Sequence, residues 1–88
     1  MPNVVKGKGL IGFHPGYYLE EYIDAENLTA KEIAEMIGVN EERFKDVLNG
    51  DICLDYDLIK KIAAATGTSE IFWERLNKEF YKKVELIL

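Results

Sequence analysis

The stretch LTAKEIAEMIGVNEERFKDVLNG, residues 28–50, decides the fold of this chain. Thr29 is followed three positions later by a glutamate, which is a capping box, so we expect a helix to begin at residue 30. Apolar residues then recur at helical spacing until Gly38, a residue that suits the left-handed end of a helix. An asparagine N-cap and a second apolar stripe predict another short helix over residues 41–48.

Three further helices are predicted around this stretch. The first begins at His14-Pro15-Gly16, because proline fits the first helical turn, and it ends near Asn27. The fourth is capped by Asp55 and ends at Gly67, and the fifth is capped by Ser69. Two short helices joined by a tight glycine turn form a helix-turn-helix. The fold class is therefore all-α, a compact five-helix domain.

The 88 residues fit one domain with an N-terminal extension. Residues 1–13 hold three glycines in a mixture of apolar and polar residues, which predicts an extended or partly mobile arm that could pair as a short edge strand. Residues 14–88 form the single helix-turn-helix domain. Their last residues, Val84, Leu86, Ile87 and Leu88, are more apolar than a small monomer readily buries, so we expect them at a homodimer interface or a partner site.

Composition indicates a soluble protein of a reducing, cytoplasmic compartment. The one cysteine, Cys53, cannot form an internal disulfide and is expected to be a half-buried apolar residue. No apolar run approaches the roughly 20 residues that cross a bilayer, so no membrane partner is expected.

Nothing in the sequence predicts an enzyme or a cofactor. His14 is the only histidine, and no nucleophile or carboxylate pattern accompanies it, so we interpret it as a structural residue at the start of the first helix. No cysteine and histidine cluster has metal-site spacing. The glycines at positions 7, 9 and 12 spell a dinucleotide-binding pattern, but no strand and helix unit surrounds them.

The stretch 28–50 resembles the XRE (lambda-repressor-like) helix-turn-helix family. His14-Pro15-Gly16 and the string TSEIFWERL, residues 68–76, extend the resemblance to HigA-type antitoxins of toxin–antitoxin modules. The match spans residue 14 to about residue 80. It implies a DNA-binding domain that often dimerises, represses its own promoter and neutralises a basic ribonuclease toxin. In that geometry the third helix enters the major groove.

The resemblance also implies which residues face DNA or a partner. These are Thr29, Lys31, Glu41, Glu42, Arg43, Lys45, Asp46 and Asn49. Several positions depart from the family pattern, because Ala30, Glu41, Glu42, Asp46 and Asp51 stand where polar or basic residues are usual.

The charge of the helix-turn-helix predicts weak or salt-sensitive DNA binding. The net charge is −5, and residues 16–57 hold twelve acidic against three basic residues. Carboxylates oppose contact with phosphates, which dominate the affinity for DNA. Glu41 and Glu42 have two interpretations: they accept hydrogen bonds from cytosine N4, or they stabilise the positive end of the helix dipole.

An alternative function follows from the same charges. A helix-turn-helix domain with an acidic face can be a protein-interaction module that binds a basic partner protein without binding DNA. Operator binding would favour the regulator, and co-purification with a basic protein would favour the interaction module. Phe72 and Trp73 have helical partners at Leu76 and Phe80, so we expect them in the core or a dimer interface rather than stacked on bases.

Overall fold

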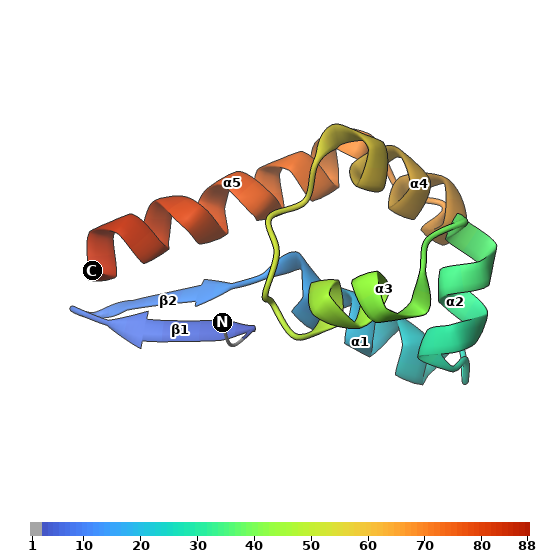
Figure 1. The fold of residues 1–88 in the computed structure, drawn as a ribbon. Coiled ribbons are helices and arrows are strands. Elements are labelled where there is room, and N and C mark those ends of the chain that lie inside the picture. The colour runs from blue at the N-terminus through green and yellow to red at the C-terminus, as the bar shows by residue number, and fades with distance from the viewer. Residues whose placement is uncertain (1–2) are drawn as a thin grey trace.

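The computed structural model describes residues 3–88, and in these the five predicted helices are confirmed (Figure 1). Their bounds are α1 Pro15–Ala25, α2 Ala30–Ile37, α3 Glu41–Leu48, α4 Tyr56–Thr66 and α5 Glu70–Ile87. The predicted limits of α2 and α3 are therefore correct. α1 ends near Asn27 as predicted: Glu26 is its C-cap, and Asn27 has a φ of 55° and cannot continue a helix.

Local side-chain chemistry explains where α2 and α3 begin and end. Thr29 Oγ1 accepts a hydrogen bond from Glu32 N at 3.1 Å, and Glu32 Oε1 accepts one from Thr29 N at 3.1 Å, which completes the capping box. Gly38 ends α2 with a φ of 72°, where a side chain would be strained. Asn40 Oδ1 then caps α3 by accepting from Glu42 N at 2.8 Å.

The N-terminal arm is a β-hairpin. β1 Val4–Gly7 pairs antiparallel with β2 Leu10–Phe13, whereas the sequence predicted an extended arm with a short edge strand at most. Lys8 and Gly9 both have positive φ, 50° and 77°, which is the geometry of a tight two-residue hairpin turn. Met1 and Pro2 of the predicted arm lie outside the described residues.

The hairpin packs on the C-terminal half of α5 (Figure 1). Gly7 and Gly12 allow this close approach, because a Cβ on Gly7 would lie 2.7 Å from Ile87 Cγ2 and one on Gly12 would lie 3.3 Å from Lys83 Cβ. The apolar C-terminal tail is therefore partly covered by the chain itself. Leu86 and Leu88 nevertheless remain exposed, at 54% and 91%.

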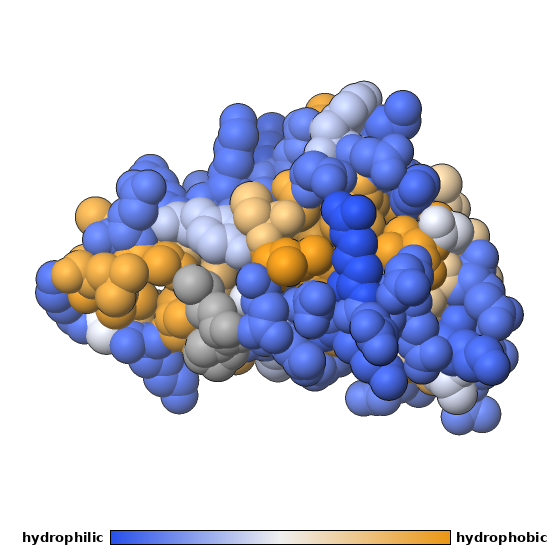
Figure 2. All heavy atoms as spheres, in the orientation of Figure 1, coloured by the Kyte–Doolittle hydropathy of each residue, from blue (hydrophilic) through white to orange (hydrophobic). Residues whose placement is uncertain are grey.

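The hydrophobic core lies among α1 to α4 and the first half of α5. Its fully buried side chains include Leu19, Ile33, Phe44, Leu58 and Ile62. Trp73 is also buried and donates a hydrogen bond from Nε1 to Thr68 Oγ1 at 2.6 Å, while Phe72 is 42% exposed. α5 then leaves the bundle toward the hairpin, which gives a long molecule of 38 × 21 × 21 Å. Figure 2 shows apolar side chains at the hairpin end and mostly hydrophilic ones over α1, α2 and α3.

Cys53 is exposed, so the expectation that it is half-buried is wrong. It lies in the segment between α3 and α4, where its Sγ is 3.8 Å from Asn77 Oδ1 of α5. Its neighbours differ: Leu54 belongs to the core and Ile52 packs against it.

Candidate nucleic-acid interface

α3 has a buried side and an exposed side. Phe44 and Val47 are fully buried against the core. Most of the polar side chains predicted for the DNA or partner surface occupy the other side of α3. The other two, Thr29 and Lys31, lie at the start of α2, which packs against α3. α3 therefore presents a polar surface on a rigid apolar base. This is the arrangement that a helix needs in order to lie in a groove.

The entrance to α1 holds the C-terminal end of α3 in place. Gly16 packs so closely on α3 that a Cβ there would collide with the carbonyl oxygen of Val47 and lie 3.0 Å from that of Leu48. Asn3 Nδ2 donates a hydrogen bond to Leu48 O. The predicted helix-start signal His14-Pro15-Gly16 is thus also a contact with α3.

His14 fixes the segment that follows α3. It is fully buried, as expected for a structural residue, and caps α1: Nδ1 accepts from Gly16 N at 2.9 Å. Nε2 must then carry the proton, and it donates to Ile52 O at 2.8 Å. Burial lowers the pKa of His14 below its ordinary 6.5, although the Ile52 carbonyl and the Asp51 carboxylate oppose that shift. A neutral imidazole therefore connects α1 to the α3–α4 segment.

Two of the three basic residues in the site are held by carboxylates. Arg43 Nη2 lies 3.0 Å from Asp55 Oδ2, and Lys45 Nζ lies 3.5 Å from Glu41 Oε1, one helical turn away. Both pairs are solvent-exposed, so they contribute little to stability. They do reduce the positive charge that α3 offers to an anion. Lys31 is exposed and forms no ion pair with another residue in the part of the chain that the structure describes.

The remaining predicted residues have distinct places. Thr29 is exposed, and its hydroxyl oxygen is already used to cap α2, which leaves its proton as a donor. Glu42 and Asp46 are exposed on α3, and Asn49 is its exposed C-cap. Glu41 is half-buried and belongs to the ion pair with Lys45.

Asp55 is the residue that the sequence did not assign to this site. The sequence predicted it only as the N-cap of α4, a role that is confirmed: Oδ1 accepts from Leu58 N at 2.8 Å. That hydrogen bond and the Arg43 guanidinium lower the pKa of Asp55 below its ordinary 3.8. Asp55 and Arg43 are twelve residues apart and lie at different helices, so the spacing of charges along the sequence does not predict that they pair.

The described part of the chain holds no group of three or more histidine, cysteine, aspartate or glutamate side chains that could bind a metal ion. None of the helices within residues 3–88 has the length and apolar character of a membrane span.

The comparisons with known proteins agree with this geometry. A family model described as helix-turn-helix matches residues 19–73. No curated protein matches the chain. An addiction module antidote protein of a HigA family from Coxiella burnetii is 28% identical, with a TM-score of 0.78 over 84% of this chain and 82% of that one.

Two further solved structures share the fold. An antidote protein of a plasmid maintenance system from Nostoc punctiforme is 23% identical, with a TM-score of 0.82 over 85% of this chain and 82% of that one. The antitoxin HigA of Pseudomonas aeruginosa, solved with the higBA promoter, is 20% identical, with a TM-score of 0.79 over 83% of this chain and 80% of that one.

Proposed function

Because the chain belongs to the helix-turn-helix family, we propose that it is a HigA-like antitoxin that also regulates transcription. The observation that carries this proposal is the similarity to the HigA-family antidote protein of Coxiella burnetii, which extends over most of both chains. The Pseudomonas aeruginosa antitoxin with the same fold was solved with promoter DNA, which supports a DNA-binding role for this architecture. The protein is on this proposal a cytoplasmic binding protein and not an enzyme.

Operator DNA is the first proposed ligand. α3 lies in the major groove, and Lys31, Arg43 and Lys45 contact phosphates. The Thr29 hydroxyl and the Asn49 side chain supply neutral hydrogen bonds to the backbone. The exposed carboxylates of Glu42 and Asp46 then face base edges, where a carboxylate accepts a hydrogen bond from cytosine N4.

The ion pairs make this binding costly. Arg43 and Lys45 must each exchange a carboxylate partner for a phosphate, so the gain from each contact is reduced. Three phosphate contacts per protomer correspond to a slope of about −3 in log K against log salt concentration. We therefore propose operator binding that is measurable at low salt and falls steeply as salt is added.

A basic toxin is the second proposed ligand. Residues 16–57 carry an excess of nine acidic side chains, and such a surface speeds association with a positively charged protein. The antitoxin is proposed to act as a homodimer, which matches the two half-sites of an operator.

Fluorescence anisotropy against the DNA upstream of its own coding sequence tests the regulator role. At ~50 mM salt we expect tighter binding to this DNA than to a scrambled duplex. Lys31→Ala should weaken binding and make the salt slope shallower by about 1 per protomer, which is about 2 for the homodimer. Lys78→Ala is the matched control, because Lys78 is an exposed lysine on α5. Equal affinity for both duplexes would refute the regulator role.

Co-purification tests the toxin role and the alternative function together. A small basic protein that is retained through ion exchange supports the antitoxin. If that partner is retained while operator binding is absent, the protein-interaction module is the correct description. If no basic partner binds, the antitoxin role is refuted whatever the DNA titration gives.

A further inference from the structure

Asn77 of α5 makes two hydrogen bonds to the backbone of one residue, Leu54. Its Oδ1 accepts a hydrogen bond from Leu54 N at 3.3 Å, and its Nδ2 donates one to Leu54 O at 3.3 Å. Leu54 is buried and lies in the segment that joins α3 to α4. Asn77 therefore satisfies both backbone groups of a buried residue from a helix that is distant in the sequence. An amide side chain suits this role because it offers one acceptor and one donor group side by side.

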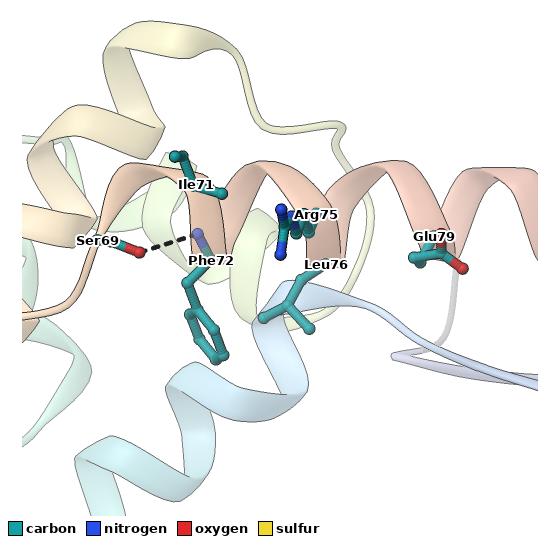
Figure 3. Close-up of a pocket in the computed structure, with 6 residues that line it drawn as sticks. All are labelled: Ser69, Ile71, Phe72, Arg75, Leu76 and Glu79. Atoms are coloured by element: carbon teal, nitrogen blue, oxygen red, sulfur yellow. Dashed lines mark hydrogen bonds between the residues drawn. The ribbon is translucent and has the colours of Figure 1, made fainter.

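Asn77 lies on the side of α5 that faces the helical bundle. Trp73 precedes it by one helical turn and Phe80 follows it by another, and both are buried, so the three share one side of the helix. The pocket in Figure 3 lies elsewhere on α5, because Phe72 and Arg75 line it and Asn77 does not. Asn77 thus belongs to the contact between α5 and the α3–α4 segment.

The two hydrogen bonds fix the backbone that leads into Asp55. The carbonyl group of Leu54 and the N–H group of Asp55 belong to one planar peptide unit, so a bond that orients the carbonyl also orients the start of Asp55. From that position Asp55 Oδ2 lies 3.0 Å from Arg43 Nη2, while Oδ1 caps α4. A continuous series of contacts therefore runs from Asn77 on α5 to Arg43 on the exposed side of α3.

The Arg43–Asp55 pair depends on such support because it is solvent-exposed. Its side chains are 53% and 56% exposed, and an exposed pair gains little energy while it loses side-chain entropy. A fixed backbone at one partner reduces the entropy that is lost when the pair forms. The Lys45–Glu41 pair has no such support from α5, since both of its residues lie on α3.

We propose that Asn77 is a positioning residue for operator binding: it holds the Asp55 carboxylate at Arg43 and thereby reduces the positive charge that α3 offers to DNA. This inference rests on the proposed function, because operator DNA is the ligand whose affinity Asn77 adjusts. Without the Asn77 amide, Asp55 still caps α4 through Oδ1, but its other oxygen is no longer held at Arg43. The guanidinium is then available to a phosphate.

Operator titrations at ~50 mM salt test this role. Asn77→Ala should raise the affinity by up to about five-fold, which is the gain expected when the Asp55 carboxylate itself is removed. In a protein that already carries Asp55→Asn, the same substitution should add nothing, because the carboxylate that Asn77 positions is absent. Tyr81→Phe is the matched control: it removes a neutral polar group one turn further along α5 and leaves both Leu54 contacts in place.

An NMR titration of the Asp55 carboxyl group tests the positioning without DNA. The pKa of Asp55 is lowered below 3.8 by the Leu58 N–H group and by the Arg43 guanidinium. In Asn77→Ala this pKa should rise part of the way toward 3.8, since the contact with Arg43 is lost and the Leu58 hydrogen bond remains. Asn77→Leu should give the same rise, because leucine keeps the branched shape of the side chain but has no amide.

The outcomes separate this inference from the proposed function. An unchanged Asp55 pKa in both Asn77 variants would overturn it. A loss of operator affinity in Asn77→Ala, or an equal gain with and without the Asp55 carboxylate, would overturn it as well. A raised pKa in a protein that fails to bind operator DNA would support the positioning of Asp55 and refute only the regulator role.

Discussion

Two regions around α3 differ in how they are built: the entrance to α1, which packs against the end of α3, and the exposed side of α3 itself. At the entrance, His14 is fully buried with both ring nitrogens hydrogen-bonded, and Gly16 packs directly on α3 carbonyl groups. On the exposed side, Arg43 and Asp55 form an ion pair whose side chains are 53% and 56% exposed. Buried contacts of the first kind decide whether α3 is in place, and exposed contacts of the second kind decide what it can bind.

Gly16→Ala tests the buried region and should have the largest effect. Alanine favours a helix by about 1 kcal/mol over glycine, but its Cβ would collide with the Val47 carbonyl, which is backbone and cannot rotate away. We expect the free energy of unfolding to fall by about 3 kcal/mol, as in strongly overpacked cores. Urea denaturation measures the change.

Asp24→Ala is the control for that substitution. Asp24 is exposed on the same helix, so its replacement should change the free energy of unfolding by less than about 0.5 kcal/mol. A Gly16→Ala variant as stable as this control would mean that α1 and α3 are not in direct backbone contact.

Much of the fold could be predicted from the sequence because its signals are local. The capping box at Thr29, the glycine at position 38 and the N-caps at Asp55 and Ser69 act within one helical turn, and all four are confirmed. The hairpin could not be predicted from the sequence, because its turn requires a positive φ at Lys8. Lysine rarely adopts a positive φ, so this residue gives no turn signal.

The candidate site was less predictable because its contacts are not local. The sequence places acidic and basic residues on α3 but does not say which of them pair. Arg43 with Asp55, His14 with Ile52 and Gly16 with Val47 all join separate elements, so only the packed structure brings them together. The roles of the surface residues of α3 toward DNA or a toxin stay predictions.

Lowering the pH tests the entrance to α1 through His14. Its pKa is lowered in the folded protein, so below the unfolded value of 6.5 the unfolded chain binds a proton that the folded chain resists. The contribution of His14 to stability is complete above pH 6.5 and is lost as the pH falls from 6.5 to the folded pKa. One such group changes the free energy of unfolding by at most about 1.4 kcal/mol per pH unit.

Urea denaturation from pH 8 to pH 5 measures this slope, and His14→Gln is the comparison. Asp55 does not interfere in this range, because its contribution is lost only as the pH falls below 3.8. We expect the wild type to lose more stability than His14→Gln between pH 6.5 and pH 5. Parallel stability curves for the two proteins would show that His14 titrates alike in the folded and unfolded states.

Asp55→Asn tests the exposed side and should have the smallest effect on stability. Asparagine is also a good N-cap, so α4 keeps its cap and the free energy of unfolding should fall by less than about 1 kcal/mol. Arg43 loses its carboxylate partner and becomes available to a phosphate, so operator affinity at low salt should rise by roughly five-fold. Asp57→Asn makes the same change of charge two residues away but releases Lys61 instead. If the two variants raise the affinity equally, the gain comes from net charge alone, and the Arg43–Asp55 pair does not limit DNA binding.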